Sequence, residues 1–304
     1  MALKVAVIVL LANLVATSYG WGLEGHRVTA TIAQHFLSQA AKDAVYSILD
    51  PRYRGQLGPI ASWADEIKRN PAYAWSRPYH YVDSHDNPPT TCLFKASDCE
   101  DGVCVTSAIA NYTKILQDCR VTMASKNEAL KFLTHYIGDI AQPLHVSGRA
   151  RGGNEAHCTF DGHSTQFHAV WDYMLLEKHV KTDFASSEDK FTSYLIESLE
   201  SGPLSHNRTE WESCIPDAAS PDGMTCILEW ATDTNHISCP VWGAYSTSGD
   251  IGRGAPYDLM AQILELQLAK GGVRLAAFLN EALGKTCFSL WDYVPGGRVG
   301  VWGV

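Results

Sequence analysis

The sequence predicts a mainly α-helical protein with one domain. Large apolar residues recur at steps of three and four over most of the chain, as at Val105, Ile109 and Tyr112, and this is the period of one buried helix face. There is no convincing alternation of apolar and polar residues, which would mark a half-buried strand. The segments between the helical runs are rich in Pro, Gly, Asp, Ser and Cys, and we expect them to be long loops at 84–104, 146–166, 202–223 and 240–256.

The helices are expected in a definite order. A step of four from Val28 to Phe36 predicts the first one. A late helix over 263–279 is expected to be interrupted at Gly271-Gly272, because glycine is unfavourable inside a helix. The same period predicts further helices over 105–116, 130–140 and 167–175.

Composition and charge narrow the function classes. The 304 residues include 24 Lys and Arg against 33 Asp and Glu, for a formal net charge of −9, and 46% of them are hydrophobic. A largely disordered chain is therefore excluded. A general basic surface for polyanions is excluded as well, so any affinity for nucleic acid must come from a local positive site.

The first 20 residues are typical of a secretory signal peptide. Lys4 supplies the positive end, residues 5–15 form the apolar core, and Ser18 and Gly20 are the small residues before a cleavage point at Trp21. The apolar run is too short to span a bilayer. We therefore expect a secreted, extracellular protein without a membrane anchor.

The mature chain is expected to divide into a functional domain and a tail. The domain covers residues 21–287, while residues 288–304 lack a helical pattern and form a C-terminal tail that is mobile or removed. Asn111 and Asn207 each begin an Asn-x-Thr triplet without proline, so both are expected to carry glycans in a secreted chain. No stable protein partner is indicated, and we expect a monomer.

Nine cysteines in a secreted chain predict disulfide bonds. Cys99 and Cys104 flank a short Asp-Gly turn, and Cys214 and Cys226 flank a loop with Pro and Gly, so both pairs are expected to form local bonds. Pairing as such does not follow from the sequence. The odd count leaves at least one thiol unpaired or bonded to another molecule.

Two pairs of residues indicate a metal site. His135 and Asp139, and likewise His168 and Asp172, are four residues apart within apolar helical runs, so each pair lies on one helix face. A surface ion pair is the commoner explanation of one such spacing. Two pairs among large apolar residues favour a divalent metal ion, which suits imidazole and carboxylate together.

Four more residues are candidates only in combination with these pairs. His145 follows the break at Pro143 and can turn back toward the first pair. The others are Asp65, His80 and His26. Taken singly, each of them is better explained as a polar core residue with a hydrogen-bond partner.

In combination, these residues resemble the zinc-dependent single-strand-specific nucleases of fungi and plants, also called class I nucleases. The match runs from Trp21 to about Leu283, and the Asn-Pro-Pro loop and spacing are more similar to the fungal branch. It rests on ordered motifs: Trp21-Gly22-x-x-Gly25-His26, Trp63-Ala64-Asp65, Pro78-Tyr79-His80, Asp86-Asn87-Pro88-Pro89, Gly138-Asp139-Ile140-x-Gln142-Pro143-Leu144-His145, Gly152-Gly153-Asn154 and His168-x-x-Trp171-Asp172.

The resemblance implies a multi-helix fold around a cleft with three Zn²⁺ ions, and long loops that bear disulfides. The first ion would be held by Asp65, His80, His135 and Asp139, and the second by His145, His168 and Asp172. The third would take the free amino group and carbonyl of Trp21, with His26 and the bridging carboxylate of Asp139. The implied disulfides are Cys92 with Cys239 and Cys99 with Cys104, which leaves Cys119, Cys158 and Cys287 unassigned.

The implied activity is hydrolysis of phosphodiester bonds in single-stranded DNA and RNA to 5′-phosphate products, with 3′-nucleotides as further substrates. The implied catalytic residues are Lys68, Asp65 and Asp139, with Lys68 stabilising charge on the phosphate in the transition state. Tyr81 would stack on a base, and Asp83 and Asn154 would bond its edge.

Two other functions stay open. Zinc phospholipases C share the implied fold and zinc ligands, although Tyr81, Asp83 and Asn154 favour a nucleobase over a choline headgroup. A secreted, disulfide-bonded binding protein with structural zinc is the non-enzymatic alternative. Structural zinc sites usually have four protein ligands, whereas the set His145, His168 and Asp172 has three and leaves room for water or substrate.

Overall fold

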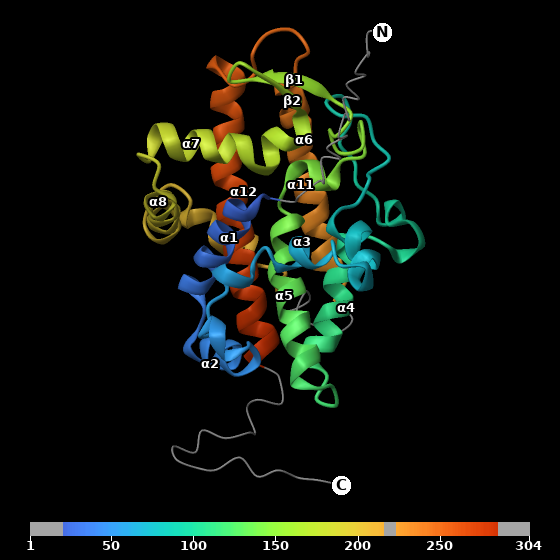
Figure 1. The fold of residues 1–304 in the computed structure, drawn as a ribbon, viewed down its shortest axis with the longest axis vertical. Helices are drawn as coiled ribbons and strands as arrows, with labels where there is room; N and C mark the ends of the chain where they lie inside the picture. The colour runs from blue at the N-terminus through green and yellow to red at the C-terminus, as the bar shows by residue number, and fades with distance from the viewer. Residues whose placement is uncertain (1–20, 216–222, 285–304) are drawn as a thin grey trace, which may run out of the picture.

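The computed structural model describes residues 21–215 and 223–284 of the chain (Figure 1). The expected signal peptide, the C-terminal tail and Cys287 lie outside these residues. The described part is mainly helical and contains one two-stranded sheet, which confirms the predicted fold class. None of the described helices is both long and apolar enough to cross a membrane.

The helices differ widely in length. The α-helices are α1 (Leu23–Phe36), α2 (Gln39–Ile48), α3 (Trp63–Ile67), α4 (Val105–Gln117), α5 (Met123–Asp139), α6 (Phe167–Ala169), α7 (Leu175–Asp183), α8 (Glu188–Glu200), α9 (Arg208–Trp211), α11 (Thr225–Ala244) and α12 (Gly254–Gly284). The 3-10 helices are η1 (Pro51–Tyr53), η2 (Gly58–Ile60), η3 (Pro71–His80), η4 (Ala96–Asp98), η5 (Glu100–Gly102), η6 (Pro143–Val146) and η8 (Ser205–Asn207), while η7 (Val170–Met174) is a π-helix. The strands are β1 (His157–Phe160) and β2 (His163–Gln166).

Helix α12 is the central element of the fold. In Figure 1 it runs through most of the length of the molecule, and α1, α2, α5, α7 and α11 all contact it. Every residue from Gln267 to Ala276 is buried, so this stretch has no face toward solvent. A helix that is buried all round belongs to the interior of a protein, and the shorter helices therefore pack around α12.

The predicted interruption of the last helix at Gly271-Gly272 is wrong. Helix α12 continues through both glycines, because they lie against α1. A Cβ on Gly272 would lie 2.5 Å from Cγ2 of Ile32 and 3.2 Å from the carbonyl oxygen of Thr29. The two glycines therefore allow a close approach of helices and do not end one.

The loop predicted at 146–166 is wrong in part, because a β-hairpin forms within it. Strands β1 and β2 pair antiparallel and are joined by Asp161 and Gly162, whose φ angles are 51° and 82°. Asp-Gly is a preferred residue pair in a two-residue hairpin turn because both positions need positive φ. The dipeptide was thus a usable signal in the sequence.

The loop predicted at 240–256 begins later than expected. Helix α11 continues through Pro240 to Ala244. Proline has no N–H, so the carbonyl of His236, four residues earlier, loses its helical partner. Both residues are exposed, and water can bond that carbonyl, which explains why the helix tolerates the proline.

Two apolar clusters form the core. Leu133 and Ile137 of α5 belong to the first, and Trp171 of η7 belongs to the second. Helix α1 contributes to both, with Ala33 in the first cluster and Val28 in the second. Since the two predicted His/Asp pairs lie on α5 and on the α6–η7 segment, they meet where these clusters adjoin.

Disulfide bonds fasten several of the long loops. The described bonds are Cys92–Cys239, Cys99–Cys104 and Cys214–Cys226, the three pairs expected from the sequence. Cys119 is also disulfide-bonded. Cys158 on β1 is a buried free thiol, in agreement with the odd number of cysteines.

The substitution Gly272→Ala is expected to destabilise the protein by about 1–3 kcal/mol, because the new methyl group overpacks the contact with Ile32. Gly243→Ala is the matched control, since a Cβ at Gly243 of α11 would meet nothing within 4 Å. Urea denaturation followed by circular dichroism measures both. Equal stability of Gly272→Ala and the parent would show that α1 and α12 can separate here without cost.

Candidate metal centre

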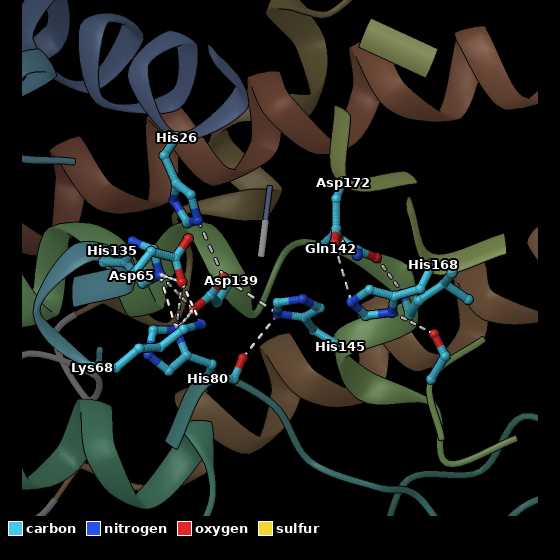
Figure 2. Close-up of polar contacts among 12 residues, drawn as sticks. His26, Asp65, Lys68, His80, His135, Asp139, Gln142, His145, His168 and Asp172 are labelled. Atoms are coloured by element: carbon cyan, nitrogen blue, oxygen red, sulfur yellow. Dashed lines mark hydrogen bonds and ion pairs between the residues drawn. The ribbon is translucent and has the colours of Figure 1, made fainter. Parts of the chain in front are cut away.

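The predicted ligand side chains converge in the middle of the fold (Figure 2). They are His26 on α1, Asp65 on α3, His80 at the end of η3, His135 and Asp139 on α5, His145 on η6, His168 on α6 and Asp172 on η7. All eight are at most 4% exposed. Three groups have ligand atoms within 4.8 Å of one another, namely His26 with Asp65 and His135, His80 with His135 and Asp139, and His145 with His168 and Asp172.

Asp139 lies at the centre of the site (Figure 2). Its Oδ1 is 3.3 Å from Nε2 of His26 and 3.3 Å from Nδ1 of His145. Its Oδ2 is 3.0 Å from Nδ1 of His80 and 3.1 Å from Nε2 of His135. Four histidines from four elements thus surround one carboxylate, and the spacing of four on α5 points His135 and Asp139 the same way.

Asp65 adds a second carboxylate to this group. Its Oδ1 lies 3.5 Å from Nδ1 of His80 and 3.6 Å from Nε2 of His135. The same oxygen accepts a hydrogen bond of 2.6 Å from Nζ of Lys68, which is only 9% exposed. Lys68 is therefore held beside the site and is not a solvated surface lysine.

His145, His168 and Asp172 form the neighbouring group. The rings of His145 and His168 are stacked with their centroids 5.4 Å apart, and Nε2 of His168 is 3.3 Å from Oδ2 of Asp172. The helix predicted here widens into the π-helix η7 at the position of Asp172. Such single π-turns inside helices are frequent at functional sites.

Backbone carbonyls orient three of the histidines. Nδ1 of His135 donates to the carbonyl oxygen of Ala61 at 2.7 Å, and Nδ1 of His145 donates to that of His80 at 2.9 Å. Nδ1 of His168 donates to the carbonyl oxygen of Gly152 at 2.5 Å. Each bond fixes the ring and leaves Nε2 as the nitrogen for a ligand, the arrangement that is typical of metal-binding histidines.

Several buried atoms of these side chains have no hydrogen-bond partner among the described residues. They are both ring nitrogens of His26, Nε2 of His80, Nε2 of His145 and Oδ1 of Asp139. Buried polar atoms without partners are costly, and here they are imidazole nitrogens and a carboxylate oxygen of the ligand groups. This donor set fits divalent metal ions such as zinc.

The pKa values show that the charges of the site balance only in part. Burial tends to raise the pKa of Asp139, but His135 and His145 hold it well below its usual range. Burial tends to lower the pKa of His135, but Asp139 and Asp65 raise it to about 10. Asp172 has Gln142 beside it, and burial raises the pKa of this aspartate well above its usual value. The group around Asp172 therefore needs a cation to stay ionised.

Trp21 is fully buried next to the second group. Its ring packs on Trp171 with the centroids 6.5 Å apart, and the backbone N–H of Gly22 donates to the carbonyl oxygen of Asp172 at 2.5 Å. A Cβ on Gly22 would lie 2.9 Å from that oxygen. The start of the expected mature chain is thus fixed to the backbone of a candidate ligand.

The residues expected to bind a base lie on an open side of the site. Tyr81 and Asp83 follow directly after His80 and are exposed, Tyr81 to 38%. Asn154 lies on the loop that starts at Gly148, and a Cβ on Gly148 would be 3.2 Å from the carbonyl carbon of Asp83. The structure therefore brings the loop of Asn154 against the segment of Tyr81 and Asp83.

Gln142 is a buried side chain of the site to which the sequence pattern assigns no role. Its Nε2 donates to Oδ1 of Asp172 at 3.0 Å, and its Oε1 accepts from the backbone N–H of Leu144 at 2.5 Å. The side chain is fully buried and orients a candidate ligand. A long polar residue in the apolar run between Ile140 and Leu144 was the available signal.

The two expected glycosylation sites lie apart from these groups in the fold. Asn111 on α4 is exposed and lines a cavity of about 330 Å³ together with Trp75, Tyr79 and Tyr112. Asn207 ends η8 and is half-buried. Glycosylation at both positions stays a prediction.

Comparison with known proteins agrees with this geometry. A sequence profile described as S1/P1 nuclease matches residues 21–284. The chain belongs to the S1/P1 nuclease family. Nuclease PA3 from a Penicillium species is 37% identical to it over 269 residues, which cover 87% of this chain and 98% of the relative.

Two further relatives show the breadth of the S1/P1 nuclease family. Nuclease S1 from Aspergillus oryzae is 36% identical over 268 residues, or 86% of this chain and 92% of the relative. Endonuclease 3 from Arabidopsis thaliana is 32% identical over 280 residues, or 90% and 92%. The resemblance to the nucleases of fungi and plants is thereby confirmed, with higher identity to these two fungal proteins than to the plant one.

The metal-free S1/P1 nuclease is expected to lose stability as the pH falls from 6.5 to 4. Burial lowers the pKa of His26 and His80 to about 4 and that of His168 to about 3, so these rings stay neutral when folded but take up protons on unfolding. Each histidine lowers the free energy of unfolding by up to about 1.4 kcal/mol for every pH unit of this fall. Asp172, whose pKa is raised, offsets one of the three.

Thermal denaturation of the chelator-treated protein between pH 6.5 and 4 measures this effect. The pKa of histidine in the unfolded chain is about 6.5, so the stability that the three neutral histidines contribute is complete above this pH. It is lost as the pH falls toward their pKa values in the folded protein. His135 changes nothing in this window, because its raised pKa affects stability only above pH 6.5. A melting temperature that stays constant down to pH 4.5 would contradict buried neutral histidines.

Proposed function

We propose that this S1/P1 nuclease is a secreted, zinc-dependent endonuclease that hydrolyses single-stranded DNA and RNA to 5′-phosphate products and also acts on 3′-nucleotides. The observation that supports this most is the set of buried imidazole and carboxylate groups around Asp139. Its relatives are nucleases and endonucleases by name, which agrees with the proposal.

The proposed ligands divide over three Zn²⁺ ions. The first ion would be bound by Asp65, His80, His135 and Asp139, the second by His145, His168 and Asp172, and the third by Trp21, His26 and Asp139. Trp21 would contribute its amino group and carbonyl, which requires removal of the signal peptide, because an acylated nitrogen is a poor ligand. When bound, zinc supplies a Lewis acid that polarises the phosphate and lowers the pKa of water.

Lys68 and Asp65 would act on the phosphate as a pair. The hydrogen bond of 2.6 Å to Asp65 holds the ammonium group of Lys68 at the edge of the ligand set. A fixed positive charge there stabilises the negative charge that grows on the phosphate during hydrolysis. Because the whole chain has a formal charge of −9, this local charge also attracts the substrate to the site and not to the surface.

The exposed residues beside the ligands support a preference for single strands. Tyr81 offers a ring face on which a base can stack, and Asp83 and Asn154 offer groups for its polar edge. A base in a duplex is already stacked and paired, so it must leave the helix before it reaches Tyr81. Single-stranded substrates avoid that cost.

The protein cleaved before Trp21 is expected to hydrolyse a single-stranded oligonucleotide much faster than the matching duplex, to lose activity with a chelator and to regain it with zinc.

Asp139→Asn is expected to lower the zinc content and to slow hydrolysis by at least ~100-fold, since it removes the central charge of the site. Elemental analysis and product chromatography provide the two readouts.

Asp183→Asn is the matched control for this variant. Asp183 pairs with His179 at 2.8 Å with the same spacing of four residues, but neither residue belongs to the three ligand groups. Normal zinc content and rate are expected for it.

The same assays on the parent protein separate the alternative functions. Hydrolysis of phosphatidylcholine instead of single-stranded DNA would favour a phospholipase C, and zinc retention with no hydrolysis would favour a binding protein with structural zinc.

Tyr81→Ala is expected to weaken binding of single-stranded substrates by roughly 1–3 kcal/mol, the usual contribution of an aromatic stack on a base. The zinc content should not change, because Tyr81 is not among the ligand groups. Kinetics on an oligonucleotide and on a phosphodiester without a base separate the two effects, and Tyr46→Ala on α2 serves as the exposed-tyrosine control. Equal losses on both substrates would mean that Tyr81 merely supports His80.

A further inference from the structure

The loop from Gly148 to Asn154 links the proposed base pocket to the second ligand group. At its start, a Cβ on Gly148 would lie 2.5 Å from the carbonyl oxygen of Ser84. Further along, the carbonyl oxygen of Gly152 accepts the hydrogen bond from Nδ1 of His168. The loop is therefore packed against the backbone of the site at both of these points.

Arg151 lies between these two points, with its backbone held firmly. Its N–H donates to the carbonyl oxygen of Gly148 at 3.0 Å, and its own carbonyl oxygen accepts from Nδ2 of Asn154 at 2.9 Å. Its φ is 53°, a left-handed conformation within a run of positive φ from Ala150 to Gly153. The direction of the side chain is thus set by the loop that also carries Asn154.

The guanidinium group of Arg151 is on the solvent side of this loop. The side chain is 78% exposed, and its ion pair with Glu155 is 3.7 Å long and exposed as well, so it holds the group weakly. Arg149, two residues earlier, is engaged: it stacks on Trp242 at 4.4 Å and donates to the carbonyl oxygen of Pro88 at 2.7 Å. Of these two arginines, Arg151 is the one that can reach a ligand.

The loop geometry places Arg151 near the base pocket. Its carbonyl oxygen accepts from Asn154, and Gly148 at the start of the same loop lies against the backbone of Asp83 and Ser84. In agreement with this, the positive charge of Arg151 acts against the rise that burial causes in the pKa of Asp83. A positive charge beside the pocket attracts a strand that is negatively charged. The guanidinium group is also the group best suited to a phosphate oxygen, through paired N–H donors.

We propose that Arg151 binds a phosphate of the substrate strand next to the one that is cleaved, and so gives the site its preference for polynucleotides over mononucleotides. The inference rests on the proposed function, because it assumes that a strand crosses the site with one base at Tyr81. A nucleoside 3′-monophosphate offers only the reacting phosphate and cannot use this contact. Every internal nucleotide of a strand offers an adjacent phosphate.

The test compares the parent with Arg151→Gln, which keeps a Cβ and therefore the backbone strain at this position. The ratio of kcat/KM for a single-stranded oligonucleotide to that for a nucleoside 3′-monophosphate is expected to fall about fivefold to tenfold, through KM, as for the loss of one exposed charge-assisted hydrogen bond. The slope of the logarithm of oligonucleotide affinity against the logarithm of salt concentration should become shallower by about 0.7.

Fluorescence anisotropy with a phosphorothioate oligonucleotide measures binding without cleavage. Arg151→Gln should bind it about fivefold to tenfold more weakly, and Arg151→Lys should retain most of the salt dependence because it keeps the charge. Arg120→Gln is the control, since Arg120 is 89% exposed and bonded to Asp118 in the loop between α4 and α5.

The outcomes separate this inference from the proposed function. If Arg151→Gln lowers kcat/KM equally for the oligonucleotide and the nucleoside 3′-monophosphate, Arg151 only shapes the loop. If neither oligonucleotide binding nor the ratio of the two kcat/KM values changes, Arg151 does not contact the substrate. Either result overturns the inference. A parent that binds the oligonucleotide through Arg151 but cleaves neither substrate would contradict the proposed function and leave the phosphate contact standing.

Discussion

The ionised carboxylate of Asp139 is the constraint on which the rest of the site depends. A fully buried charge is stable only where opposite charge and hydrogen-bond donors surround it. Here the surrounding groups are imidazoles from α1, η3, α5 and η6. A shift of one of these elements would move an imidazole away from the carboxylate, so the polar centre helps to fix how the helices are arranged around it.

The position of His26 shows how packing far from the ligands serves the centre. A Cβ on Gly138 would lie 2.9 Å from Nδ1 of His26, so a larger residue on α5 would displace the ring. Further along the helix that carries His26, Gly272 lets α12 approach Ile32. Helix α1 is thus located by two glycines on two other helices, and this puts its histidine within 3.3 Å of Asp139.

Orientation of the ligands is largely the work of the backbone. The carbonyl oxygens of Ala61, His80 and Gly152 each accept from Nδ1 of one histidine and thereby leave its Nε2 as the nitrogen for a ligand. Two of these carbonyls belong to segments that also carry proposed substrate contacts, because Tyr81 follows His80 and Arg151 precedes Gly152. The same short segments therefore orient ligands and present groups to the substrate, which couples the geometry of binding to that of the centre.

The sequence by itself determined which side chains form the centre and that the fold is helical. The spacing of four puts His135 and Asp139 on one helix face. The period of the apolar residues predicts a helix even when the helix that packs against it is not known. The motifs that contain Asp65 and His80 resemble those of a known family, and this resemblance assigns both residues to the same site. Local spacing alone could not do so, because these residues lie on separate segments that only the folded chain brings together.

Only the tertiary structure decided how the remaining residues are used. Two consecutive glycines, Gly271 and Gly272, predict a break in the helix, yet α12 is continuous because both glycines pack against α1. Arg149 and Arg151 are equivalent in the sequence, and one faces inward because Trp242 of the distant helix α11 lies beside it. Such outcomes depend on contacts between residues far apart in the chain, which outweigh local preferences and leave no trace in the pattern of neighbouring residues.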